Sequence, residues 1–156
     1  MLQNGAARPM LPNGPPVTQR RSPRRKSMDR AARAAFLDSI LQSSTEYSLI
    51  AMDLDGRIIA WNEGARRIYG YEESEVTGKS AFLLSDPDDV RSGRALQVLA
   101  TVRDAGAWSG EVKRRRKDGS SFIAFVTLTL RHDVKGRPEG FTLISRDISE
   151  AKRLTE

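Results

Sequence analysis

Short apolar segments with two different periods follow a polar N-terminal stretch in this chain. Five segments are rich in apolar residues and end at turn residues, which predicts strands at residues 46–53, 57–61, 108–116, 121–132 and 140–148. Helical spacing or helix-starting residues predict helices at residues 28–43, 63–70 and 87–105, with a short turn at residues 72–76. The strands are grouped before and after the helices, so we expect an α+β fold with one antiparallel sheet rather than alternating parallel units.

Turn and capping residues support these boundaries. Asp-Gly pairs at 55–56 and 118–119 lie between apolar segments, and glycine supplies the positive φ angle that a tight hairpin turn needs. Asn62 is a strong helix N-cap residue, and the fixed φ angle of Pro87 suits the first turn of a helix.

The positive charge of the chain belongs to its first 35 residues. They carry eight basic side chains and one acidic one, whereas the rest of the chain carries 18 basic and 19 acidic ones. Residues 1–27 are rich in Pro, Gly, Asn, Gln and Arg and lack apolar periodicity, so we predict a disordered tail. Its arginine-rich stretch at 20–26 could bind nucleic acid or an anionic membrane by charge, or remain a solvated tail without a specific partner.

The composition of the chain argues against several classes of function. The chain has no cysteine, which excludes disulfides, thiolate metal sites and cysteine nucleophiles. The sequence shows neither a bilayer-spanning apolar run nor a signal-peptide segment, so we expect a cytoplasmic protein. It also shows no nucleophile–base pairing and no cluster of metal ligands, so we expect a binding protein rather than an enzyme.

Four strings in the chain resemble PAS domains, which are sensory modules of signalling proteins. They are DLDGRIIAWNEGARRIYGY from Asp53, EESEVTGKS from Glu72, WSGEVKRRRKDGSSF from Trp108 and GFTLISRDISEAK from Gly140. Together they have the order and spacing of the family, and they place its domain at residues 44–150. The resemblance implies a five-stranded antiparallel sheet, with short helices packed on one face around a small interior pocket.

Four positions depart from the light-oxygen-voltage branch of that family, whose pocket holds flavin. Ala81 stands where that branch has its reactive cysteine, Arg114 and Ala124 where asparagines are expected, and Ser145 where a glutamine is expected. Each buried hydrogen bond that flavin would lose costs about 1–3 kcal/mol. The chain is therefore similar to that branch in layout, without its photochemistry.

These residues do not determine which cofactor, if any, the pocket binds. Trp108-Ser109-Gly110 is similar to redox sensors that bind a flavin dinucleotide, so a flavin-binding redox sensor is an alternative, though not the favoured one. Heme is disfavoured because the segment 87–105 has no histidine for the iron, and His132 lies at a strand end. A small ligand, or none, completes the set of alternatives.

The strand positions that contact flavin in that branch point inward, and this assigns the pocket here. The implied lining residues are Phe82, Leu83, Leu96, Leu99, Arg114, Phe122, Ala124, Val126, Phe141, Leu143 and Ser145. Arg114 and Ser145 are the polar members of an otherwise apolar set, which suits a lipid-like molecule or a small aromatic acid. A closed core, in which these side chains pack against one another, is an equal alternative.

The alternate strand positions lie on the outer face of the sheet, and they include Ile123, Phe125 and Ile144. Apolar side chains on such a face should be covered. The expected cover is the N-terminal helix of the same chain or of a second subunit, through Phe36, Ile40 and Leu41. We therefore expect a homodimer.

Asp147-Ile148-Ser149 resembles the family's junction between the last strand and an output helix. In relatives the aspartate and the hydroxyl residue hold this joint, and residues 151–156 here would begin a linker helix. An ion pair between Glu75 and Lys117 also fits the family pattern.

These features together predict a sensory module that dimerises and relays the binding of a small ligand or partner. The effector would be of the histidine kinase, cyclase or phosphatase type, in cis or in trans. A ligand-free protein–protein adaptor is the alternative from another class, and tethering to nucleic acid or a membrane through the basic tail is a third role.

Overall fold

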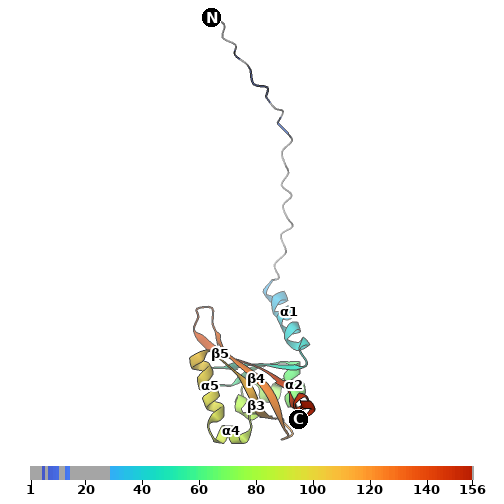
Figure 1. Ribbon diagram of the computed structural model, residues 1–156, viewed down its shortest axis with the longest axis vertical. Helices are drawn as coiled ribbons and strands as arrows, with labels where there is room; N and C mark the ends of the chain where they lie inside the picture. Colours follow the sequence, from blue (N-terminus) through green and yellow to red (C-terminus); the bar gives the residue numbers. More distant parts are fainter. Residues whose placement is uncertain (1–4, 6, 11–12, 15–28, 156) are drawn as a thin grey trace.

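Five strands form one antiparallel sheet, in the order β2-β1-β5-β4-β3. Figure 1 labels β3, β4 and β5 of this sheet. The computed structural model describes residues 5, 7–10, 13–14 and 29–155. The strands span Tyr47–Asp53 (β1), Ile58–Trp61 (β2), Ala107–Arg115 (β3), Ser121–His132 (β4) and Pro138–Asp147 (β5). The predicted α+β class and five-stranded sheet are therefore confirmed. The arginine-rich stretch at 20–26, on which the predicted tail interactions depend, lies outside the described residues.

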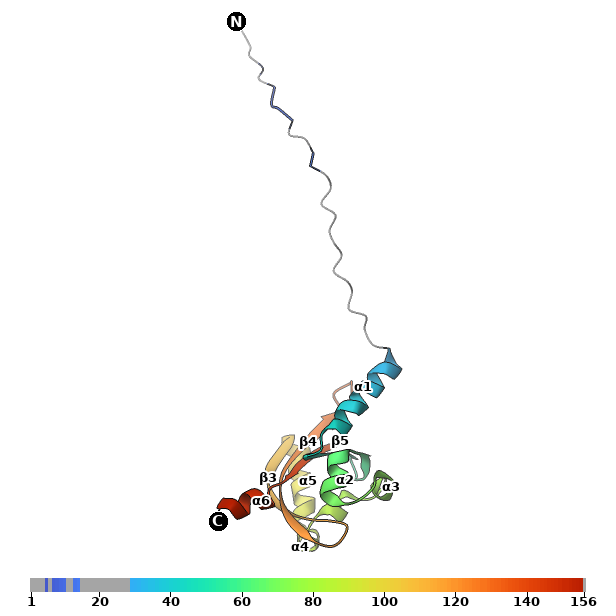
Figure 2. The same cartoon turned by 90° about the vertical axis from the view of Figure 1, so that its right-hand side faces the viewer.

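Short helices pack on one face of this sheet. They are α2 (Glu63–Tyr69), α3 (Glu73–Val76), the 3-10 helix η1 (Ala81–Leu84), α4 (Pro87–Arg91) and α5 (Arg94–Ala105), with α1 (Arg30–Ser43) before the sheet and α6 (Ser149–Thr155) after it. Figure 2 shows α2, α3 and α5 on one side of the strands and α6 on the other. Within the described residues, no helix has both the length and the apolarity needed to cross a bilayer.

The core lies between the inner face of the sheet and these helices. Along β4, Phe122, Ala124, Val126 and Leu128 are buried, as the alternation of apolar residues predicts. Helix α2 approaches β1 closely because residue 64 is glycine: a Cβ atom there would lie 1.9 Å from the Tyr47 carbonyl oxygen.

The predicted single helix at 87–105 is wrong, because Ser92 and Gly93 divide it into α4 and α5. Gly93 has a φ angle of 80°, which is costly for residues with a side chain and easy for glycine. The apolar residues on the two sides of the break therefore do not share one helical face. Val102 is fully buried, whereas Leu96, a predicted pocket residue, is 63% exposed.

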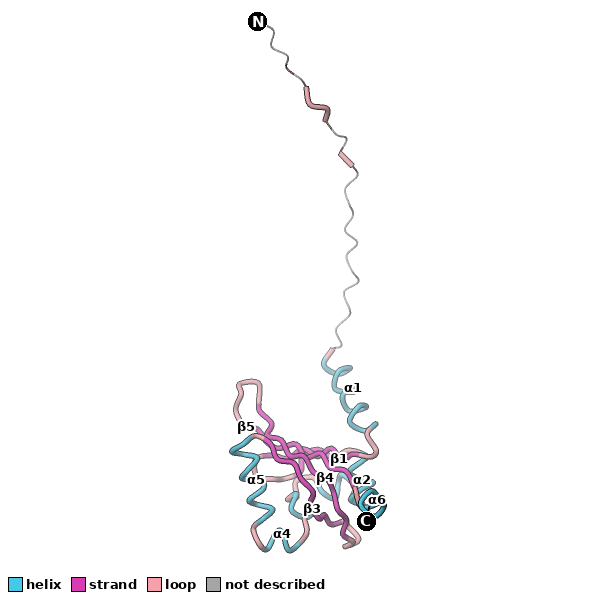
Figure 3. Tube along the Cα trace, viewed as in Figure 1, coloured by secondary structure: helices cyan, strands magenta, loops and turns pink. Residues whose placement is uncertain are grey.

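Helix α1 does not cover the sheet of its own chain, which corrects one of the two predicted arrangements. It buries none of its residues, and Phe36 and Ile40 are about half exposed. Figure 3 shows α1 directed away from the strands. The cause lies at its end: the Asn62 side chain donates hydrogen bonds to the carbonyl oxygens of Leu41 and Ser44 and so fixes the helix end beside α2.

Candidate functional site

A small cavity lies between the inner face of the sheet and the helices η1, α4 and α5. Its volume is about 60 Å³. The lining is mainly apolar, with a few polar and charged side chains; it comprises Met52, Ala81, Phe82, Ser85, Asp89, Arg94, Ala95, Val98, Leu99, Trp108, Val112, Lys113, Arg114, Val126, Leu128 and Leu143.

The structure brings only part of the predicted pocket together at this cavity. The members that line it are Phe82, Leu99, Arg114, Val126 and Leu143. Four others are buried in the adjoining core or polar chain, namely Phe122, Ala124, Phe141 and Ser145. Leu83 is partly buried against the core, and Leu96 is exposed in a surface groove that it shares with Phe82, Leu99 and Phe141. One part of the inner face therefore borders an open cavity, and the other part is a closed core. The sequence had left these two arrangements as alternatives.

Some lining residues carried a sequence signal and others did not. Leu128 continues the inward alternation of β4, so this alternation predicts that it faces the cavity. Leu128 is not among the positions that contact flavin in the light-oxygen-voltage branch, and it was therefore absent from the predicted lining. Ser85 follows η1 in a segment without periodicity, and it faces the cavity because its backbone bridges to Arg114 on β3.

Arg114 is the charged group at the centre of this region, and it is only 7% exposed. Its Nε donates to the Tyr69 hydroxyl at 3.3 Å, and its Nη1 donates to the Ser85 hydroxyl at 3.2 Å. Its third nitrogen, Nη2, is buried and has no hydrogen-bond partner among the described residues. The two acceptors are neutral, so the guanidinium charge is held without a carboxylate in contact within the described part of the chain.

The Tyr69 hydroxyl extends this polar chain across the inner face of the sheet. It is hydrogen-bonded to the Ser145 hydroxyl on β5 at 2.9 Å, and Ser145 is in turn hydrogen-bonded to Ser48 on β1. All three side chains are almost fully buried. Buried hydroxyls need such partners, because a buried hydroxyl without a hydrogen bond destabilises the fold by more than one hydrogen bond stabilises it. Ser145 was predicted as a polar pocket residue, and the structure places it in this chain instead of on the cavity wall.

Asp147 forms the joint between β5 and α6. Its Oδ2 accepts from Arg116 Nη2 at 2.7 Å, and its Oδ1 accepts from the Ser149 backbone N–H at 2.9 Å. The Ser149 hydroxyl accepts from the Ile123 N–H at 3.0 Å, and the Ile148 N–H donates to the Ile123 carbonyl at 2.9 Å. The start of α6 is thereby hydrogen-bonded to β4 as well as to β5.

The ionisation of Asp147 follows from these contacts. Partial burial acts to raise its pKa, but the Arg116 guanidinium and the Ser149 N–H and hydroxyl outweigh burial and hold the pKa below its ordinary value of 3.8. Arg116 is itself held in place, since its Nη1 donates to the Ile68 carbonyl at 2.6 Å and its guanidinium stacks 4.1 Å from the centre of the Phe122 ring.

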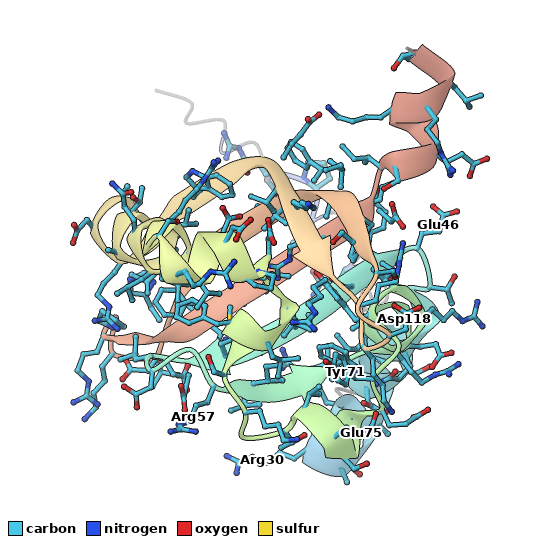
Figure 4. The ribbon with its side chains drawn as sticks, turned by 90° about the horizontal axis from the view of Figure 1, so that it is seen from below. Arg30, Glu46, Arg57, Tyr71, Glu75 and Asp118 are labelled. Atoms are coloured by element: carbon cyan, nitrogen blue, oxygen red, sulfur yellow. The ribbon has the colours of Figure 1, made fainter. Side chains whose placement is uncertain are left out.

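The expected ion pair between Glu75 and Lys117 is present, with 2.5 Å between Nζ and Oε1. It joins α3 to the turn between β3 and β4, where Figure 4 shows Glu75, Tyr71 and Asp118 near one another. The hydrogen bond from Lys117 lowers the pKa of Glu75. Both side chains are well exposed, so the pair contributes little to stability.

The outer face of the sheet carries exposed apolar side chains. Phe125 is 46% exposed and Ile144 is 37% exposed, while Ile123 is partly buried. Phe125 and Ile144 line a surface groove together with Tyr47 and Ile148. The structure thus shows the apolar surface that the strand alternation predicts, without showing what covers it.

The inner cavity does not fit flavin. About 60 Å³ is room for a few water-sized groups, far less than a three-ring flavin head requires. The side chains at the flavin-reading positions do not fit either: Ala124 has no polar group, and Ser145 is committed to Ser48 and Tyr69. The described residues also contain no group of three or more His, Cys, Asp or Glu side chains placed to hold a metal ion.

Two curated proteins share this sequence pattern over most of the chain. Two-component system protein A of Emericella nidulans is 32% identical over 113 residues, which are 72% of this chain and 16% of that protein. The cell-division control histidine kinase PdhS of Brucella ovis is 30% identical over 126 residues, which are 77% of this chain and 11% of that protein. The chain therefore spans less than a fifth of the length of either relative.

Solved structures have the same arrangement of strands and helices. The PAS domain of a protein from Colwellia psychrerythraea superposes with a TM-score of 0.68 at 24% identity, covering 76% of this chain and 98% of that one. An RNA-binding light-oxygen-voltage receptor superposes with a TM-score of 0.65 at 18% identity, covering 84% of this chain and 37% of that one. At these identities the likeness shows the fold alone.

One antiparallel sheet, helices on its inner face, a cavity between them and a helix joint at the last strand define a sensory α+β domain. The chain belongs to the PAS domain family, whose pattern residues 46–150 match. Within that family it resembles domains found in two-component histidine kinases.

Proposed function

We propose that this chain is the input module of a signalling protein and passes the state of its inner face to an effector through α6. The observation that carries the proposal is the joint at Asp147, which ties the first residues of α6 to two strands at once. The relatives support an effector in cis, because their matching segments are small parts of much longer proteins that include a histidine kinase. The proposed role is binding and relay, not catalysis.

A short run of contacts would connect the cavity to that joint. Arg114 donates a hydrogen bond to the Tyr69 hydroxyl. The carbonyl oxygen of Ile68, the residue before Tyr69, accepts a hydrogen bond from Arg116. Arg116 lies two positions after Arg114 on the same chain segment and holds Asp147. A displacement of Arg114 or Tyr69 would thus shift the end of α2 and the guanidinium that orients α6.

Dimerisation is the second part of the proposal. The outer face of the sheet presents Phe125 and Ile144, and α1 of the same chain leaves them uncovered. Helix α1 has its own exposed apolar residues, Phe36 and Ile40. Two copies could cover both surfaces by packing α1 of one against the sheet of the other.

The relay is tested by fusing the chain in frame to the catalytic core of a histidine kinase that lacks its own sensor. We expect Asp147→Ala to change the autophosphorylation rate at least about fivefold, because the first residues of α6 lose the carboxylate that holds them to Arg116 and to the end of β5. Asp133→Ala is the matched control. Asp133 also accepts backbone N–H groups and pairs with an arginine, but in the β4–β5 turn away from α6.

An equal autophosphorylation rate in the wild-type and Asp147→Ala fusions, with both domains folded by circular dichroism, would contradict the relay. A change of the same size in the Asp133→Ala fusion would assign the effect to general destabilisation and also contradict it.

A further inference from the structure

The inner cavity is lined by a buried cation, Arg114, that forms no ion pair with any residue the structure describes, and this narrows the chemical class of the ligand. Arg114 is more than nine-tenths buried, and its Nη2 has no hydrogen-bond partner among the residues that the structure describes. A buried guanidinium is costly unless it is paired, and its planar fork of N–H donors matches a carboxylate. We propose that the cavity binds a small monocarboxylate, with Arg114 as its anchor; this rests on the proposed sensory function and names the ligand class.

The charges around the cavity favour an anion. Arg94, Lys113 and Arg114 line it against a single acidic residue, Asp89. Arg94 is exposed and Arg114 is buried, whereas Lys113 lies opposite Ile123 in the strand register, so its side chain is on the outer face of the sheet. The lining therefore attracts negative charge from solvent and holds it at the buried guanidinium.

The hydroxyl partners of Arg114 leave room for a carboxylate. Ser85, which accepts from Nη1, lines the same cavity. Nη2 stands beside Nη1 on the guanidinium, so a carboxylate that accepts from Nη2 also comes within reach of the Ser85 hydroxyl. That hydroxyl is a donor as well as an acceptor and would supply a second hydrogen bond.

The size and polarity of the cavity set the rest of the ligand. A volume of about 60 Å³, at roughly 10–15 Å³ for each water-sized group, gives about four to six non-hydrogen atoms. The walls away from Arg114 are apolar, with Val98, Leu99, Val126 and Leu143 among them. These properties fit short aliphatic acids from acetate to butyrate better than the lipid-like and aromatic acids that the lining residues alone suggested.

Calorimetric and NMR titrations of the full chain with sodium butyrate test the assignment. We expect saturable binding, with shifts of backbone amides at cavity residues such as Ser85, Val112 and Val126. Butyramide has nearly the same shape without the charge and is expected to bind at least about tenfold more weakly, as a charge-assisted hydrogen bond is lost. Sodium chloride at equal ionic strength controls for screening, and sodium decanoate is expected not to bind.

Variants then assign the binding to Arg114. Arg114→Gln should weaken butyrate binding at least about tenfold, whereas Arg115→Gln, which changes an exposed arginine at the next position of β3, should leave it within about twofold. If Arg114→Gln does not fold, the butyrate–butyramide comparison on the wild-type protein decides alone.

No saturable butyrate binding, equal binding of butyramide, tight decanoate binding or unchanged binding by Arg114→Gln would each overturn the inference. The kinase fusion described above carries no added carboxylate. A changed rate in Asp147→Ala beside absent butyrate binding would therefore reject this ligand alone, and butyrate binding beside an unchanged rate would reject the relay alone.

Discussion

At the scale of single residues, a few buried polar side chains determine how the parts of this domain are held together. Asn62 is 1% exposed and uses both ends of its amide. Its Oδ1 accepts from the N–H groups of Leu49 and Ala65, and its Nδ2 donates to three carbonyl oxygens. One side chain thus caps α2, contacts β1 and fixes the end of α1.

Replacing Asn62 by alanine is expected to lower the free energy of unfolding by about 2–4 kcal/mol, because several buried backbone groups lose their partner. Urea unfolding followed by tryptophan fluorescence measures the loss. Asn62→Asp keeps an acceptor for the two N–H groups but turns a buried carboxylate oxygen toward the three carbonyl oxygens, so its loss at neutral pH should be at least as large. A loss below about 0.5 kcal/mol for Asn62→Ala would show that this network is not a main source of stability.

Sequence patterns located such residues better than they defined their roles. The position of Asn62 before a helical segment predicts an N-cap, and the cap is present. Its contacts to α1 join backbone groups that are distant along the chain, and no local pattern encodes them. Arg114 was likewise identified as a polar residue of the inner face, whereas its unpaired nitrogen depends on where Tyr69 and Ser85 lie after folding.

At the scale of elements, strands were more predictable than helices. Burial on one face of the sheet imposes a strict two-residue alternation, so β4 is readable from its sequence alone. Helices α4 and α5 were read as one helix because the apolar residues around Gly93 approximate helical spacing, and a single positive φ angle overrides that spacing. Leu96, predicted to line the pocket, is exposed on α5.

The joint between β5 and α6 has a pH dependence that tests its electrostatics. The folded state lowers the pKa of Asp147, so the carboxylate stabilises the fold above its ordinary pKa of 3.8, and this stability is lost as the pH falls through the lower folded value. We expect Asp147→Asn to be less stable than the wild-type protein by about 1 kcal/mol near neutral pH, as the pair with Arg116 is partly exposed.

Thermal unfolding of both proteins from neutral to strongly acidic pH measures this difference. Below the ordinary pKa of Asp147 the gap between the two proteins should shrink toward zero. Other acids with lowered pKa values, such as Glu75 and Asp133, are present in both proteins and cancel in the comparison. A gap that stays constant to the lowest pH would contradict the assigned role of the carboxylate.

At the scale of the whole molecule, the two faces of the sheet have different proposed roles: ligand binding on the inner face and dimerisation on the outer face. The inner face holds the cavity and the polar chain, and the outer face presents Phe125 and Ile144 to solvent. Light scattering at high concentration is expected to show a dimer of the wild-type chain. Phe125→Glu should weaken dimerisation by about tenfold or more, since a charge would enter the apolar interface.

Thr101→Glu adds the same charge on an exposed position of α5, on the other side of the sheet, and should leave the dimer intact. A wild-type chain that remains a strict monomer at high concentration would contradict dimerisation through this face.

We propose that the inner face of the sheet and α6 are coupled through Tyr69, Arg116 and Asp147. Tyr69→Phe removes one hydroxyl, which bonds Arg114 and Ser145, and Tyr71→Phe is the matched control because the hydrogen bond described for Tyr71 uses its backbone carbonyl. Backbone amide shifts in NMR spectra of both variants give the most direct measurement. Tyr69→Phe is predicted to shift the amides of residues 148–152 as well as that of Ser145, with Tyr71→Phe leaving residues 148–152 unchanged. Shifts confined to the neighbours of the Tyr69 ring, with α6 unaffected, would contradict this coupling.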